Sequence, residues 1–239
     1  MLSILLQYAS MKDLLSENYG QSIEAALEME HSMRQYAEEM TRGDLDEFLR
    51  GFAKRGVILD GRFVLLSFLS KGWQAITSQG QGHFNVDGNF SFALGYQKPG
   101  VNRPLWIAVA SIATARIASE YRSMLADEEI ETDYEPDKPL IVQLQGPGTW
   151  NYDNEAAFPE ATDALSKLKW ERALVGLVVD WAQKSKAGPV YILPGKYNLG
   201  LDNTNKDEVE RFKMRYDVTA LRMGFRRQGE GFYKKEIGE

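Results

Sequence analysis

Two glycines that follow a short apolar run form the pattern with the clearest chemical meaning in this chain. Gln143-Leu-Gln-Gly146-Pro-Gly148 ends a run, 140–144, that we expect to be a short buried strand. Glycines let a backbone approach a bulky anion, and the N-terminus of a following helix offers free N–H groups and a positive dipole end. The pattern therefore indicates a pyrophosphate-binding turn. A Gly-Pro-Gly loop that merely leaves a strand is the alternative interpretation.

The pattern and the residues after it, over about 138–239, resemble the GNAT superfamily of N-acetyltransferases. That family has Q/R-x-x-G-x-G/A at a strand end, an asparagine after the next strand, and a closing helix that ends in Gly-Phe before the last strand. The corresponding residues here are Gln143, Gly146, Gly148, Asn198 and Gly224-Phe225. The resemblance implies that acetyl-CoA is the acyl donor, held by Gln143, Gly146, Gly148 and Asn198.

A tyrosine on the closing helix of that family often protonates the departing thiolate. The usual position, four residues before the glycine, is Ala220 here, and Tyr216 lies about one helical turn earlier on a similar face. The resemblance therefore implies Tyr216 as the catalytic residue, with packing in the core as the alternative. For Asn198 the alternative is a turn residue, because 194–205 is rich in turn formers.

The activity that this resemblance implies is an acyl-CoA-dependent N-acyltransferase that moves an acetyl group to a small-molecule or protein amine. The amine attacks the thioester directly, so the protein must hold both partners, accept a proton and stabilise the oxyanion. Asp153, Glu155 and Glu160 follow the glycines, but nothing selects a base among them. The alternative is a non-catalytic binding or assembly module with an acetyltransferase-like fold.

The elements that would position these residues can be predicted from periodicity and turn signals. An α/β (α+β) fold is expected, with a mixed, partly parallel, acetyltransferase-like sheet flanked by helices, a helical segment at 1–56 and the main domain at 57–239. Asp60-Gly61 and Asp87-Gly88 predict two β-hairpins. The remaining expected elements are a helical insertion at 104–126, a strand at 140–144, a helix at 161–186, a strand at 189–193, a helix at 207–223 and a strand or hairpin at 225–237.

Composition limits the function further. The chain has 239 residues, a net charge of −6, no cysteine and two isolated histidines, His31 and His83. Disulfides, thiolate nucleophiles and cysteine-ligated zinc are excluded, and no metal site is expected. The acidic balance makes nucleic acid an improbable partner. The longest uninterrupted apolar run, 173–179, is too short for a membrane span, and the start lacks a signal-peptide pattern, so we expect a soluble cytoplasmic protein.

Overall fold

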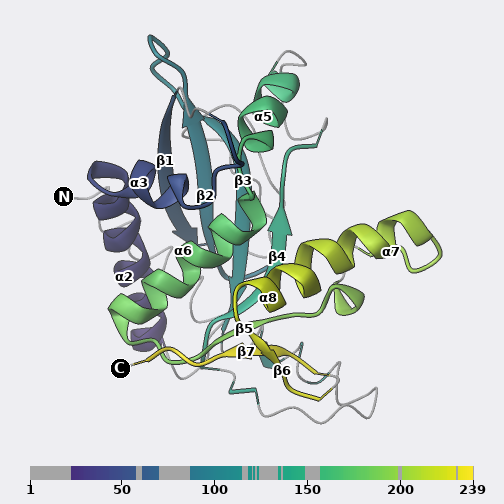
Figure 1. Ribbon diagram of the computed structural model, residues 1–239. Helices are drawn as coiled ribbons and strands as arrows, with labels where there is room; N and C mark the ends of the chain where they lie inside the picture. The colour runs from purple at the N-terminus through teal and green to yellow at the C-terminus, as the bar shows by residue number, and fades with distance from the viewer. Residues whose placement is uncertain are drawn as a thin grey trace.

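A mixed seven-stranded sheet organises the protein, shown as a computed structural model in Figure 1. The structure describes residues 23–57, 61–69, 87–114, 118, 119, 121, 123, 134, 135, 137–148, 157–198, 201–229 and 231–238. The strands are β1 (Arg62–Leu69), β2 (Phe90–Gln97), β3 (Leu105–Ala113), β4 (Leu140–Gln145), β5 (Val190–Ile192), β6 (Arg226–Arg227) and β7 (Tyr233–Lys235). Their order is β1-β2-β3-β4-β5-β7-β6, and β4–β5 is the parallel pair. The α+β class with a mixed sheet is confirmed.

Helices flank the sheet. They are α2 (Ile23–Arg42), α3 (Leu45–Arg50), α5 (Ala157–Ser166), α6 (Trp170–Ser185), α7 (Lys206–Lys213) and α8 (Thr219–Arg222). A 3₁₀ turn, Gly195–Tyr197, follows β5, and a π-helical segment, Met214–Val218, joins α7 to α8. Within the described ranges, no helix combines the length and the apolar character that crossing a membrane requires.

The main core lies between the sheet and the helices α2, α3 and α6, which lie on one of its faces (Figure 1). Phe90, Phe92 and Leu94 of β2 all point into this core, as their alternation predicts. The Phe92 ring contacts Trp181 of α6, with the ring centroids 6.1 Å apart. The Tyr36 hydroxyl of α2 donates a hydrogen bond to Asp180 Oδ2 of α6 at 2.8 Å. The N-terminal helices therefore share one core with the sheet.

The helix predicted at 104–126 is wrong for its first half. Leu105–Ala113 is strand β3, and all nine of its residues are buried. β2 and β4 cover both edges of β3, and the burial of its side chains shows that both of its faces are covered as well. A strand in that position carries an uninterrupted apolar run without period-2 alternation, and such a run cannot be told from a buried helix by pattern. In the second half of the prediction, the described residues 118, 119, 121 and 123 are helical.

Of the two predicted hairpins, the one at Asp87-Gly88 is corrected. β1, which follows Asp60-Gly61, pairs along its whole length with β2, and β2 pairs on its other edge with β3. Both edges of β2 are therefore occupied, so β2 is not the second arm of a tight Asp-Gly hairpin, whereas β1 pairs on one edge and its predicted hairpin stays a prediction. The residues just before these turns, 58–60 and 81–86, lie outside the described part. The expectation of an antiparallel region in the sheet is confirmed.

The single helix predicted at 161–186 is two helices, α5 and α6, with a break at 167–169. Contacts with a distant segment cause the break. The Lys54 N–H donates to the Lys167 carbonyl at 2.9 Å, and the Lys169 N–H donates to the Phe52 carbonyl at 2.8 Å. An isolated bridge between Ala53 and Leu168 completes this crossing. Backbone groups that bond to a distant segment cannot bond within a helix, so α6 begins afresh at Trp170. The strands predicted at 140–144 and 189–193, the helix predicted at 207–223 and the closing hairpin are confirmed.

Candidate functional site

The parallel strands β4 and β5 part after two residue pairs. Leu140 pairs with Tyr191 and Ile141 with Ile192, and the Leu193 N–H donates to the Ile141 carbonyl at 2.9 Å. Beyond this point β4 continues through Val142–Gln145 without β5 beside it. We call Val142–Gln145 the parted edge of β4. Such an edge exposes backbone donors and acceptors that need partners.

Side chains from two other elements supply the partners of the parted edge. Asn198, after the 3₁₀ turn, donates through Nδ2 to the Val142 carbonyl at 2.9 Å. The Tyr216 hydroxyl, in the π-helical segment, accepts from the Leu144 N–H at 2.9 Å and from Asn198 Nδ2 at 2.9 Å. The sequence interpretation thus named two residues that lie together on the strand of the glycine pattern. π-Helical segments occur often at functional sites, because the extra residue redirects side chains.

Tyr216 is fully buried, and burial raises the pKa of its phenol to about 12. The hydrogen bonds from Leu144 and Asn198 favour the phenolate and lower the pKa, but their effect is smaller than that of burial. In the hydrogen bonds from the Leu144 N–H and from Asn198 Nδ2, the Tyr216 hydroxyl oxygen is the acceptor. Tyr216 therefore stays protonated at neutral pH and holds a proton that it can donate. This state suits a general acid.

The raised pKa of Tyr216 predicts a loss of stability in alkali. The unfolded tyrosine titrates near 10.0 and the folded one near 12, so between these values the folded state binds more protons. The free energy of unfolding should therefore fall as pH rises through this window, by about 3 kcal/mol from this residue. Urea unfolding of the wild type and of Tyr216→Phe at several alkaline pH values measures how steeply the free energy of unfolding falls with pH. A wild-type slope no steeper than that of the variant would contradict the assignment.

Arg215 connects the parted edge to a stack of aromatic rings. Its guanidinium donates to the Leu144 carbonyl at 3.3 Å, and its Cζ lies 5.5 Å from the Trp170 ring centre and 5.8 Å from that of Phe212. Phe212 in turn stacks on Tyr216, with centroids 5.8 Å apart and an interplanar angle of 15°. An arginine held on two aromatic faces loses little further freedom when it binds an anion.

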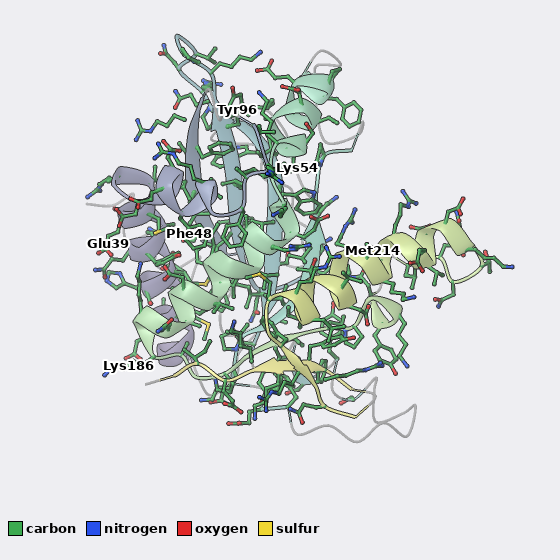
Figure 2. All side chains as sticks on the ribbon, in the orientation of Figure 1. Glu39, Phe48, Lys54, Tyr96, Lys186 and Met214 are labelled. Carbon is green, nitrogen blue, oxygen red and sulfur yellow. The ribbon has the colours of Figure 1, made fainter. Side chains whose placement is uncertain are left out.

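A groove of about 860 Å³ opens beside Arg215. It runs from the loop after β4 past the N-terminus of α6 to the helices α7 and α8, and Lys54 and Met214, labelled in Figure 2, line it. The basic side chains among its lining residues are Lys54, Lys169, Arg172, Arg211, Arg215 and Arg222, and the acidic ones are Glu171, Asp207 and Glu210. The groove is therefore more basic than the chain as a whole, which is acidic.

The first turn of α6 carries part of this charge. Lys169, its N-cap residue, makes no side-chain cap, and Trp170, Glu171 and Arg172 all line the groove. Burial raises the pKa of the Glu171 carboxyl, while Arg215, Arg172 and Lys54 lie near enough to oppose that rise. A helix N-terminus surrounded by cations is a favourable place for a phosphate group.

The glycine pattern is only partly at this groove. Gly146 and Pro147 line it, and a Cβ on Gly146 would lie 3.2 Å from the Trp170 ring. Gly148 is not among the lining residues. Gln143 lies away from the groove on the sheet, where its Oε1 accepts from Ser111 Oγ at 3.0 Å, and Ser91 Oγ donates to Ser111 Oγ at 3.3 Å. A cofactor role for Gln143 therefore has no support from its position.

Sequence reasoning missed the residues that give the groove its character. Arg215 and Trp170 lie far apart in sequence and meet only because the break at 167–169 starts a new helix beside the π-helical segment. The one signal was local: Phe212 and Tyr216 are four residues apart, the spacing at which aromatic side chains meet on a helix. Of the suggested bases, Glu160 is ion-paired with Lys98 at 2.8 Å, and Asp153 and Glu155 lie outside the described residues.

Comparisons of the chain with protein-family models, with curated proteins and with solved structures found no match. What the fold and the site define is a class: an α+β protein whose parallel strands part beside a basic groove.

Proposed function

We propose that the chain is an acyl-CoA-dependent N-acyltransferase, with acetyl-CoA as the acyl donor and an amine as the acceptor. The observation that carries the proposal is the parted edge of β4, with Tyr216 and Asn198 beside it and the basic groove at its end. The resemblance of 138–239 to N-acetyltransferases supports the same assignment.

In this proposal the two ends of the cofactor take different parts of the site. Arg215, Arg172 and Lys169 hold phosphate groups in the groove, next to Gly146 and the first turn of α6. The acyl-bearing end extends along the parted edge of β4, whose amide and carbonyl groups fit an extended chain. The Leu144 N–H is a donor for the carbonyl oxygen of the thioester, and Tyr216 is the proton source for the departing thiolate.

This arrangement requires the two side chains at the parted edge to yield their backbone contacts to the ligand. Asn198 and Tyr216 bond to each other as well as to β4, so they can move as a pair. The π-helical segment that carries Tyr216 lacks the regular α-helical hydrogen bonds, so a small change in its register costs less than breaking an α-helix.

The experiment that tests the proposal is a thermal shift with millimolar acetyl-CoA and coenzyme A. A ligand that binds only the folded state raises the melting temperature by mass action. We expect both ligands to do so in the wild type, and we expect isothermal titration to give an affinity about 10- to 100-fold weaker for Arg215→Ala, since one charged hydrogen bond is lost.

Arg42→Ala is the matched control for Arg215→Ala. Arg42 lies on α2, 77% exposed, and pairs with Glu38, so its removal changes the net charge equally without touching the groove. Equal loss of affinity in both variants would mean that only overall charge matters. That outcome would remove Arg215 from the binding site.

A non-catalytic binding or assembly module is the second candidate. The contacts of Tyr216 and Asn198 favour it, because they already satisfy the Val142 carbonyl and the Leu144 amide without any ligand. This candidate predicts no thermal shift with either ligand at millimolar concentration. It also predicts no acetyl transfer to any amine.

A further inference from the structure

Asp87 has one carboxylate oxygen that folding has buried without a hydrogen-bond partner. Among the carboxylates of the described residues, Asp87 is the one with a buried oxygen, Oδ1, that has no hydrogen-bond partner. Burial is the cause that raises the pKa of its carboxyl group. An unpaired buried carboxylate is costly, and such groups persist mainly where a ligand or a reaction uses them.

Two other partly buried carboxylates, Asp217 and Asp180, are already engaged. Asp217 accepts from the Gly195 N–H at 3.0 Å and from the Tyr233 hydroxyl at 2.9 Å. Asp180 accepts from Tyr36 and is ion-paired with Lys184. Each of these would lose an internal partner by binding a ligand. Asp87 would lose none.

The segment that carries Asp87 is held rigidly. Asn89 donates through Nδ2 to the Thr114 carbonyl at 3.3 Å, and its Oδ1 accepts from the Thr114 N–H at 2.9 Å. Gly88 lies directly on β3, because a Cβ there would come within 2.5 Å of the Ile112 carbonyl oxygen. The chain is therefore held at Gly88 and Asn89, directly after Asp87, and this fixes where the Asp87 backbone lies.

This placement brings Asp87 close to the parted edge of β4. Ile112, on which Gly88 lies, pairs with Ile141 of β4, and the parted edge begins at the next residue, Val142. The charge of Asp87 also reaches Tyr216, whose pKa it helps to raise. Oδ1 is buried, but the Asp87 side chain as a whole is partly exposed. The carboxyl group can therefore exchange protons with solvent.

We propose that Asp87 binds the ammonium group of the acceptor and takes its proton on the side of β4 where Tyr216 lies, so that the amine and the thioester meet at the parted edge. This proposal rests on the proposed function for its reaction. The binding of an ammonium group by Asp87 does not need the thioester.

The chemistry balances without any further reactant. The ammonium group gives one proton to the Asp87 carboxylate, and the neutral amine attacks the thioester carbon. A C–N bond forms, the C–S bond breaks, and the thiolate leaves with a proton from Tyr216, which regains one from the acylated nitrogen. Asp87 then releases its proton to solvent. A carboxyl group with a raised pKa is the better proton acceptor.

The test compares Asp87→Asn with Asp44→Asn. Asp44 is exposed and makes no side-chain cap hydrogen bond, so both variants change the charge equally. Without ligand, Asp87→Asn should raise the melting temperature by about 2–4 °C, because an unpaired buried charge is removed. Propylammonium chloride should stabilise the wild type and Asp44→Asn but not Asp87→Asn. Tetramethylammonium chloride, which cannot donate a hydrogen bond, should stabilise none of them.

Acetyl transfer from acetyl-CoA to propylamine should fall about 100-fold in Asp87→Asn, with coenzyme A binding unchanged. A lower melting temperature for Asp87→Asn, or stabilisation of that variant by propylammonium, would overturn the proposal. These two readouts need no acyl donor. Failure of the Asp87 assignment is therefore distinguishable from failure of coenzyme A binding, which would sink the transferase function instead.

Discussion

Replacing Tyr216 by phenylalanine is expected to lower acetyl transfer by about 100-fold or more, because the thiolate loses its proton donor. It should also lower the free energy of unfolding by about 1–3 kcal/mol. The Leu144 N–H and the Asn198 amide would keep their buried positions but lose the hydroxyl oxygen that accepts from them. Turnover with acetyl-CoA and urea unfolding at neutral pH measure the two effects separately.

Tyr197→Phe is the matched control for this variant. The Tyr197 hydroxyl is buried and has no hydrogen-bond partner among the described residues, so its removal leaves nothing unsatisfied. We expect unchanged or slightly higher stability and unchanged turnover, although the chemical change is identical. If Tyr216→Phe behaved like Tyr197→Phe in both assays, Tyr216 would be an ordinary core residue.

The parts of the fold that could be predicted are those in which local pattern and tertiary position agree. β4 and β5 are short buried strands bounded by glycine and proline. Gly224 takes a positive φ just after α8, and α6 ends in the left-handed Lys186, two residues before Gly188. Because these signals are local, the sequence was sufficient for β4, β5 and the ends of α6 and α8. The contact between Tyr216 and Asn198 is not among these local signals, because both residues were named only from the resemblance.

The features that could not be predicted depend on contacts between distant segments. β3 is apolar throughout because strands and side chains cover it on every side, so it has no periodicity to identify it. The break before α6 exists because Phe52 and Lys54 bond to backbone groups at 167–169. Asp87-Gly88 has the composition of a hairpin turn, but Gly88 is required by its approach to Ile112. The proposed role of Asp87 depends on this contact between distant segments, so the sequence could not predict it either.

The groove also depends on tertiary structure, because its cations come from five separate segments, of which α8 supplies Arg222. Lys54 follows α3, Lys169 and Arg172 begin α6, Arg211 lies on α7 and Arg215 in the π-helical segment. In sequence these residues are scattered among acidic neighbours, and the net charge of the chain gives no sign of them. A net charge of −6 argues against a nucleic-acid surface, but it does not exclude a local site for a phosphorylated ligand.

Gly146→Asp is expected to weaken acetyl-CoA binding by about 100-fold or more while leaving the fold intact. A Cβ at this position would lie 3.2 Å from the Trp170 ring and 3.3 Å from Leu165, so the new carboxylate would enter the groove at the first turn of α6. Placing like charges together at a binding site costs several kcal/mol. The nearby cations should limit the change in unfolding free energy to about 1 kcal/mol.

Two further variants separate the charge from the space that it occupies. Gly146→Ala adds the Cβ without the carboxylate and should weaken binding far less, since Trp170 and Leu165 need to shift only slightly. Gly43→Asp adds the same charge where the nearest atom to a Cβ is the Glu39 carbonyl oxygen at 3.8 Å, and it should leave binding unchanged. Titration of all three with acetyl-CoA gives the comparison. If Gly146→Asp bound as tightly as Gly43→Asp, the phosphates would not lie at this loop, and the resemblance that first drew attention to the glycines would be a coincidence of spacing.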